Sequence, residues 1–199
     1  MTDNSGKIIL DLCGGTGSWS KPYLDAGYDV RLITLPDNDV RIYVPPDNVY
    51  GILAAPPCTE FSIAKADKPR DFEEAMKVVE ACFRIIWECR KVNKLSFWAM
   101  ENPRGFLRQF IGKPPFTFEQ WQFGDSGIKP TDLWGYYNIP KIKIKEKPKN
   151  LTKKFPNGKT NSLSWSTAHY PSEHKHLGLA VLRAITPPGF AKAFFLANQ

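Results

Sequence analysis

KIILDLCGGTGS, at residues 7–18, joins a run of apolar residues to a cluster of glycines. An apolar run that ends at turn-forming residues predicts a buried strand, here over residues 7–13. The glycines allow the backbone to approach a ligand closely, and the start of the helix that follows favours negative charge. The stretch therefore predicts a strand, a ligand-binding turn and a helix, an arrangement that nicotinamide and flavin proteins also use.

Strands and helices continue to alternate along the chain. Apolar residues at helical spacing predict the longest helix over residues 71–92, and two prolines introduce the last one. The predicted elements are strands over residues 7–13, 29–34, 51–55, 95–100, 117–123 and 133–137, and helices over residues 18–26, 71–92 and 189–198. This alternation predicts an α/β fold with a mostly parallel, twisted sheet and helices on both faces.

Two of the apolar runs lead into residues with reactive side chains. The run at 51–54 continues into APPCTEFS, which contains Cys58, and the run at 95–100 continues into Glu101-Asn102-Pro103. In open α/β sheets the reactive groups lie outside the carboxyl ends of the strands. We therefore expect the thiol and the carboxyl group to face one crevice.

The glycine-rich turn and these two strings together resemble the DNA cytosine-C5 methyltransferases, in a compact form with a much reduced target-recognition region. The resemblance covers residues 7–135 and 183–199. It implies the Rossmann-like fold of S-adenosylmethionine-dependent methyltransferases. It also implies transfer of a methyl group from S-adenosylmethionine to carbon 5 of cytosine in DNA, with the base flipped out of the stack.

The resemblance assigns three catalytic residues. Cys58 is the nucleophile that adds to carbon 6 of cytosine, which makes carbon 5 reactive toward a methyl donor. Glu101 is the partner of N3 and of the exocyclic amine, and partial burial can keep its carboxyl group protonated for this purpose. Lys129 stands where the family's third motif has its first arginine. The sequence leaves open whether Lys129 contacts the base, contacts a phosphate or only caps a strand.

The resemblance also implies a cofactor site. Leu35 occupies the place of the family's ribose-binding acid, so Asp37 is the substitute, and Asp39-Val40 resembles the pair that contacts adenine. A plain turn is the alternative for this segment. The residues assigned to S-adenosylmethionine are Asp11, Gly14, Gly15, Gly17, Trp19, Asp37, Asp39, Pro56 and Thr186.

The charge of the chain is unevenly spread. Residues 1–135 hold 16 lysines and arginines against 18 acidic residues, whereas residues 136–199 hold 11 against two. The lysines that alternate over residues 141–149 are either phosphate contacts or the guards of a solvated edge strand. Beside a base-modifying centre we favour DNA as the partner. The predicted DNA contacts are Ser62, Lys141, Lys143, Lys145, Lys153 and Lys154, with Trp165 and Tyr170 as further candidates.

At 199 residues, the chain is expected to form one domain, 1–199, in which residues 136–182 are a short basic insert in place of a full target-recognition domain. The recognised target sequence is then short, recognition is lax, or a partner protein supplies it. No leader or apolar span of about 20 residues is found, which predicts a cytoplasmic protein of a bacterial or phage-infected cell. Cysteines and histidines lack zinc spacing, so no metal is expected, and Cys82 and Cys89 are predicted core residues.

Two other functions fit the same residues. The Cys/Glu chemistry can act on a free cytosine nucleotide or on RNA, or can use a modified donor. The chain can also be a non-catalytic relative that binds nucleic acid or a cofactor. Retention of Cys58 and Glu101 argues against the second alternative, while the absence of the two arginines of the family's third motif and the short insert keep the first open.

Overall fold

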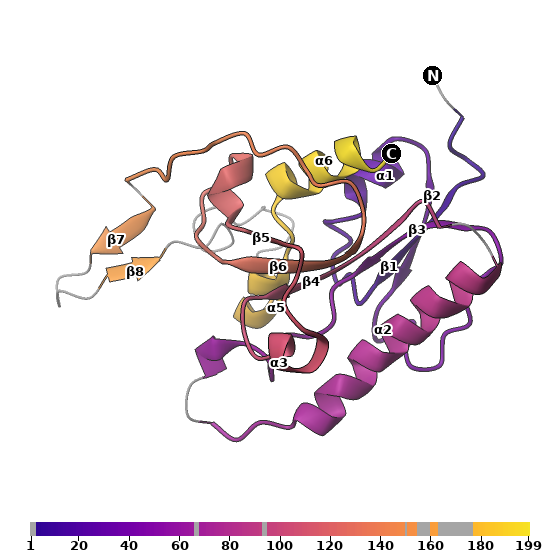
Figure 1. The fold of residues 1–199 in the computed structure, drawn as a ribbon, viewed down its shortest axis with the longest axis horizontal. Coiled ribbons are helices and arrows are strands. Elements are labelled where there is room, and N and C mark those ends of the chain that lie inside the picture. Colours follow the sequence, from indigo (N-terminus) through magenta and orange to yellow (C-terminus); the bar gives the residue numbers. More distant parts are fainter. Residues whose placement is uncertain (1–2, 66–67, 93–94, 150, 155–159, 163–176) are drawn as a thin grey trace.

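A computed structural model describes residues 3–65, 68–92, 95–149, 151–154, 160–162 and 177–199. Its centre is a six-stranded sheet with the order β2-β1-β3-β4-β6-β5 (Figure 1). The strands are β1 (Ile8–Leu12), β2 (Asp29–Ile33), β3 (Val49–Ala54), β4 (Phe97–Pro103), β5 (Phe116–Phe118) and β6 (Thr131–Tyr136). A separate hairpin pairs β7 (Thr152–Lys154) with β8 (Thr160–Ser162).

The sheet is mixed and mostly parallel, which confirms the predicted α/β class. β1 pairs in parallel with β2 and β3, and β3 pairs in parallel with β4, whereas β6 runs antiparallel to β4 and β5. Leu12, Ala54 and Met100 are register partners across the three central strands. Cys58 therefore follows β3 at the same edge of the sheet at which the end of β4 carries Glu101.

Helices cover both faces, as the alternation of elements predicts (Figure 1). The long helix α2 packs against one face, where Cys82 and Cys89 are buried as predicted. α1 and α6 pack against the other face, where Tyr23 and Phe194 contact Phe97. The helices are α1 (Lys21–Asp25), α2 (Phe72–Val92), α3 (Leu107–Ile111), α5 (Leu179–Ala184) and α6 (Pro188–Ala197), with single 3-10 turns η1 (Ile63–Lys65) and η2 (Gln120–Phe123).

The structure corrects several predicted boundaries. The strand predicted over 117–123 ends at Phe118, because the Gln122 side chain accepts the Glu119 N–H at 2.7 Å and closes η2. α1 begins three residues later than predicted, after a turn in which Gly17 has a positive φ. β4 continues to Pro103 because its last residues pair with β6, so Glu101 lies within the strand. α3, α5 and the hairpin were not predicted.

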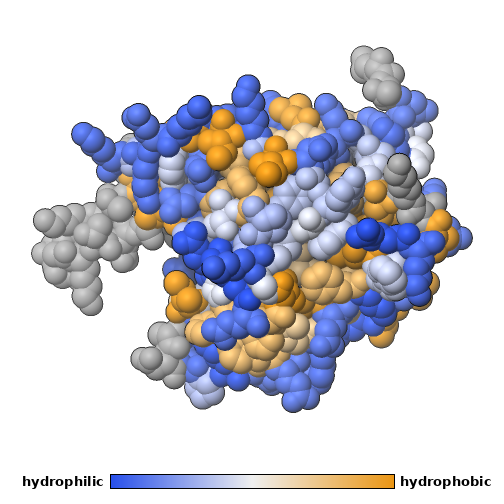
Figure 2. Space-filling view, in the orientation of Figure 1, coloured by the Kyte–Doolittle hydropathy of each residue, from blue (hydrophilic) through white to orange (hydrophobic). Residues whose placement is uncertain are grey.

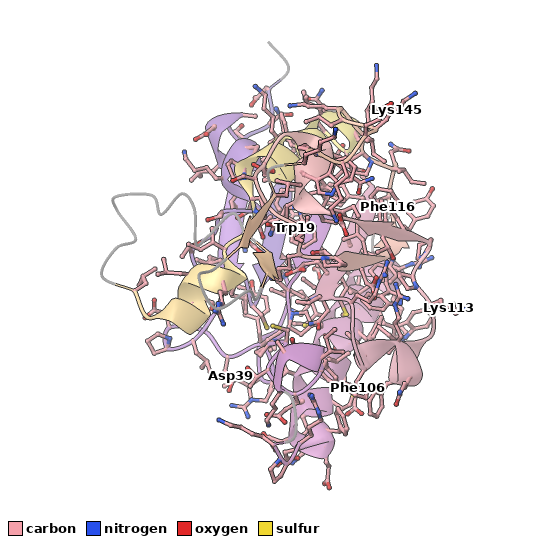
Figure 3. All side chains as sticks on the ribbon, turned by 90° about the vertical axis from the view of Figure 1, so that its left-hand side faces the viewer. Trp19, Asp39, Phe106, Lys113, Phe116 and Lys145 are labelled. Carbon is pink, nitrogen blue, oxygen red and sulfur yellow. The ribbon has the colours of Figure 1, made fainter. Side chains whose placement is uncertain are left out.

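The lysine-rich segment 141–149 forms no strand, so the edge-strand alternative is wrong for it. Its backbone instead lies beside η2, where Lys143 and Ile144 both donate N–H groups to the carbonyl oxygen of Gln122. The lysines are exposed while Ile142 packs on the α6 side of the core. Figure 2 shows mostly hydrophilic side chains along the upper edge, where this segment runs in Figure 1, and Figure 3 shows Lys145 pointing outward there. In the described parts of the chain, no helix is both long and apolar enough to cross a bilayer.

Candidate functional site

A cavity lies where the carboxyl ends of β1, β3 and β4 meet. Its wall consists of Asp11, residues 13–16 and Trp19 from the first turn, residues 55–58 after β3, Glu101, Lys129, Val181 and residues 184–186. It thus brings together all three predicted catalytic residues, Cys58, Glu101 and Lys129. Of the predicted cofactor residues, it contains Asp11, Gly14, Gly15, Trp19, Pro56 and Thr186.

Cys58 is held in a tight turn after β3. Its carbonyl oxygen accepts the N–H groups of Phe61 and Ser62 at 3.1 and 2.8 Å. The Phe61 ring is fully buried and anchors this turn in the core. Asn102 then joins the turn to β4, because its side-chain amide donates to the carbonyl oxygen of Pro56 at 2.9 Å. The thiol and the carboxyl group are therefore presented by two directly connected segments.

Burial and two nearby charges set the ionisation of the catalytic groups. Burial raises the pKa of the Cys58 thiol, while the positive charge of Lys129 lowers it and the negative charge of Glu101 raises it. Burial also raises the pKa of the Glu101 carboxyl group, against the opposing effect of Lys129. The arrangement favours a protonated carboxyl beside a thiol that needs a base or a cation to ionise.

Lys129 precedes β6 and reaches across the cavity to α5. Its ammonium group donates to the carbonyl oxygen of Arg183 at 3.1 Å. The residues that follow Arg183, which include Ile185 and Thr186, form part of the cavity wall. Lys129 thus tethers the end of α5 over the site, in addition to acting on the charges of Cys58 and Glu101.

The residues that flank the glycine-rich turn place polar atoms without a described hydrogen-bond partner in the cavity wall. Asp11 is fully buried, and one carboxyl oxygen accepts the Ser20 hydroxyl, whereas the other has no hydrogen-bond partner among the described residues. A Cβ at Gly14 would lie 2.3 Å from the Asp11 carboxyl carbon, so only glycine fits there. The buried indole N–H of Trp19, at the centre of Figure 3, also lacks a described partner. These groups suit a polar ligand with hydrogen-bonding atoms.

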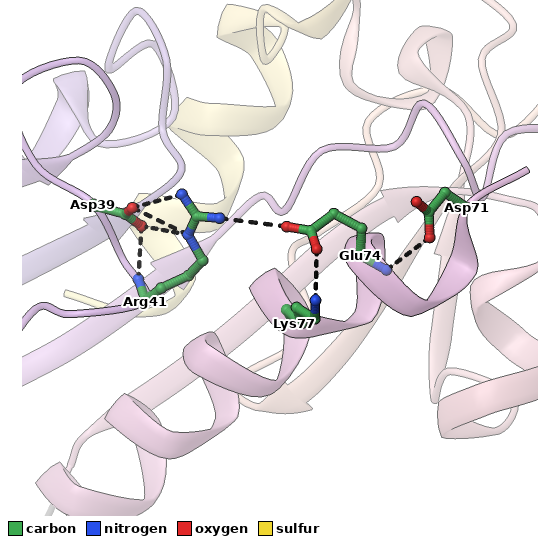
Figure 4. Close-up of polar contacts among 5 residues, drawn as sticks. All are labelled: Asp39, Arg41, Asp71, Glu74 and Lys77. Carbon is green, nitrogen blue, oxygen red and sulfur yellow. Dashed lines mark hydrogen bonds and ion pairs between the residues drawn. The ribbon is translucent and has the colours of Figure 1, made fainter.

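The structure does not bring Asp37 and Asp39 to the cavity. The Asp39 carboxylate accepts the guanidinium and the backbone N–H of Arg41, and these hydrogen bonds lower its pKa (Figure 4). Arg41 also reaches Glu74 on α2 at 3.4 Å. Asp37 is exposed and does not line the cavity. The Asp39 carboxylate is therefore engaged in a surface ion pair and does not face the cavity.

The other predicted contacts also lie outside the cavity wall. Gly17 shapes the first turn with a φ of 70°, and the Ser62 hydroxyl accepts the backbone N–H of Ala64 at 3.2 Å. The lysines of residues 141–145 are exposed on the segment beside η2, and Lys153 and Lys154 belong to β7. Trp165 and Tyr170 lie outside the described residues.

Two positioning residues were missed from the sequence. Asn102 joins the two catalytic segments, as described above, and Asp125 holds the start of α6. The Asp125 carboxylate accepts the backbone N–H groups of Gly189 and Phe190 at 3.0 and 3.1 Å, which fixes the chain just after Thr186. Asn102 directly follows Glu101, so its position was an available signal. The sequence contains no comparable signal for Asp125, which pairs with a helix more than 60 residues away.

The buried Asp11 predicts a pH-dependent stability. Desolvation raises its pKa from 3.8 to about 6, against hydrogen bonds from Ser20 that lower it. Because the folded carboxyl keeps its proton to higher pH than the unfolded one, stability falls between about pH 4 and pH 6 and stays lower above. Asp11→Asn should therefore stabilise the protein at neutral pH, by up to about 3 kcal/mol.

Urea unfolding of both proteins across this pH window measures the effect. The variant should show a shallower loss of stability with rising pH, and Asp25→Asn, which removes an exposed carboxylate, serves as the control. An unchanged slope in Asp11→Asn would contradict the assignment of this ionisation to Asp11.

Comparisons with protein-family models and with curated proteins find no match to this chain. We therefore infer the function from the geometry of the cavity and the chemistry of its side chains.

Proposed function

We propose that the chain transfers a methyl group from S-adenosylmethionine to carbon 5 of cytosine in DNA. One observation carries the proposal: Cys58, Glu101 and Lys129 come from separate segments of the chain and line one cavity together with the glycine-rich turn after β1. A thiol, a half-buried carboxyl group and a cation are the groups that the addition of sulfur to a pyrimidine ring requires.

The residues would act in a defined order. The Cys58 sulfur loses its proton and forms a bond to carbon 6, while the Glu101 carboxyl donates a proton to N3, so that the ring becomes an enamine. Carbon 5 would then form a bond to the methyl carbon of the donor, and the donor sulfur would leave with the electron pair of its broken bond to that carbon. Loss of the carbon 5 proton to a base, departure of the Cys58 sulfur as a thiolate and return of the N3 proton to the Glu101 carboxylate would restore the aromatic ring. Lys129 supports the first step because its charge lowers the pKa of the thiol.

S-adenosylmethionine would supply an electrophilic methyl group, and the residues around the first turn have hydrogen-bonding groups that can hold it. The unpaired Asp11 oxygen and the Trp19 indole N–H can bind polar groups of the ligand, and Gly14 and Gly15 let the backbone approach it. The ligand would then lie at the carboxyl ends of the strands, as in the Rossmann-like methyltransferase fold that we propose for the chain.

Ligand entry requires the end of α5 to move. The cavity encloses about 80 Å³, whereas sites that enclose nucleoside-sized ligands occupy several hundred Å³. A groove of about 750 Å³ between α1 and α6 shares Thr16, Ile185 and Thr186 with the cavity. Displacement of the segment that contains Ile185 would therefore join the two spaces into one of sufficient size.

DNA is the proposed partner because the exposed lysines are concentrated beside η2. Lys141, Lys143 and Lys145 carry no ion pair with a described residue, whereas Lys147 pairs with Glu119 at 3.1 Å. The triple alanine variant of the first three should bind duplex DNA more weakly. The logarithm of its association constant should depend less steeply on the logarithm of the salt concentration, and the magnitude of that slope should fall by about 0.9 for each phosphate contact removed. Fluorescence anisotropy over a salt series measures this slope.

The control for this measurement removes two lysines of α2. Lys77→Ala/Lys91→Ala loses positive charge on the opposite face of the sheet, away from the basic segment, and should keep the slope of the wild type. Equal slopes for the triple variant and the wild type would exclude the segment 141–145 from DNA binding.

The experiment that tests the proposed function is covalent capture. Duplex DNA containing 5-fluorocytosine cannot release the enzyme after methyl transfer, because fluorine replaces the proton that must leave carbon 5. With S-adenosylmethionine present, the chain should form a denaturation-stable adduct with this DNA. Capture of a 5-fluorocytosine nucleotide or RNA, but not of the duplex, would move the same chemistry to that substrate. No adduct with any of them would refute the proposal.

A further inference from the structure

Arg70 precedes α2 and reaches back to the loop that carries Cys58. Its guanidinium donates to the carbonyl oxygens of Glu60 and Ser62, the latter at 3.0 Å. These two carbonyls flank Phe61, whose ring is fully buried. Because a guanidinium is planar and its donors are fixed, one side chain holds the backbone on both sides of the residue that anchors the loop.

The same side chain contacts the segment that follows Glu101. The guanidinium carbon of Arg70 lies 4.6 Å from the centre of the Phe106 ring. The Phe106 N–H in turn donates to the carbonyl oxygen of Phe61 at 2.8 Å. A Cβ at Gly105 would lie only 2.2 Å from that oxygen, so the two segments are in direct backbone contact. Arg70 therefore lies at the junction of the thiol segment and the carboxyl segment.

We propose that Arg70 is a positioning residue, which holds the loop of residues 58–62 so that the Cys58 sulfur faces the Glu101 carboxyl group. Its effect on catalysis rests on the proposed function, whereas its effect on the loop does not. The role is geometric, since burial, the charges of Lys129 and Glu101, and a hydrogen bond from the backbone of Cys58 itself shift the pKa of the thiol, and Arg70 is not among these causes.

The test compares Arg70→Ala with a matched variant of Arg84, an arginine within α2. Arg84 also donates to two backbone carbonyls, those of Val40 and Tyr43, but these lie outside the cavity wall. Arg70→Ala should accelerate hydrogen exchange in the peptide 58–65 and at the Phe106 N–H that donates to it, and should leave exchange in the strands of the sheet unchanged. Arg84→Ala should leave the peptide 58–65 unchanged.

Capture on 5-fluorocytosine DNA gives the catalytic readout. The rate should fall about 10- to 100-fold in Arg70→Ala, because small displacements of a reacting group have effects of this size. Millimolar guanidinium should restore much of the rate by occupying the vacated position, and Arg70→Lys should remain impaired because it lacks the fork. The pH dependence of Cys58 alkylation should keep its midpoint in Arg70→Ala, whereas Lys129→Gln should move the midpoint to higher pH.

The outcomes separate this inference from the proposed function. Unchanged exchange in the peptide 58–65 of Arg70→Ala would overturn the inference. Faster exchange over the whole chain, with no rescue by guanidinium, would assign Arg70 a general structural role and would overturn it as well. Faster exchange confined to the loop, in a protein whose wild type captures no substrate, would support the positioning role while the proposed function fails.

Discussion

Cys58→Ala should form no covalent adduct with 5-fluorocytosine DNA under conditions in which the wild type is captured. The adduct is a bond between the Cys58 sulfur and carbon 6, and alanine has no atom that can form it. The neighbouring segments do not depend on the thiol, since the turn is held by the backbone of residue 58 and by the buried Phe61 ring. Denaturing gel electrophoresis of the protein–DNA mixture, followed by mass spectrometry of the cross-linked peptide, measures the result.

Cys13 is the competitor that this experiment must exclude. It is the other cysteine in the cavity wall, whereas Cys82 and Cys89 are buried in the core. Cys13→Ala should still form an adduct, and the cross-linked peptide of the wild type should contain Cys58. An adduct that persists in Cys58→Ala and disappears in Cys13→Ala would transfer the role of nucleophile to Cys13.

Much of the fold was predictable because local pattern and topology agree. The apolar runs that end near Leu12, Ala54 and Met100 are buried on both faces, as expected for strands in a covered parallel sheet. Parallel strands place their carboxyl ends at one edge, so the meeting of Cys58 and Glu101 followed from the order of the segments. The position of Lys129 was harder to predict, since its place in the cavity depends on β6 running antiparallel to β4.

Other features depend on contacts that no local pattern contains. Arg41 binds both Asp39 and Glu74, which are more than 30 residues apart, and this ion pair leaves Asp39 outside the cavity. The end of α5, which places Ile185 in the cavity wall, is likewise held by a long-range contact, the hydrogen bond from Lys129 to the Arg183 carbonyl. The error in the strand predicted over 117–123 has a local cause instead, since the Gln122 side chain accepts the Glu119 N–H three residues away and closes η2.

Glu101→Gln should lower turnover by about 100-fold or more, the range in which general acid catalysis contributes. Glutamine keeps the size of the side chain and can still hydrogen-bond to a pyrimidine edge, but it cannot transfer a proton to N3. Among the described residues, the Glu101 carboxyl has no hydrogen-bond partner, so the change should not disturb the fold. Single-turnover methyl transfer from labelled S-adenosylmethionine to DNA measures the rate.

Binding and stability distinguish the loss of a proton donor from a loss of structure. Glu101→Gln should bind DNA as the wild type does, and its free energy of unfolding at neutral pH should equal that of the wild type or exceed it. Burial raises the pKa of the Glu101 carboxyl, so its ionisation opposes folding at neutral pH, and glutamine removes that cost. Glu88→Gln, which removes an exposed carboxylate paired with Arg84 on α2, is the matched control and should retain full activity. Equal turnover in Glu101→Gln and the wild type would remove this carboxyl from the mechanism, and with it the reason for its burial beside Cys58.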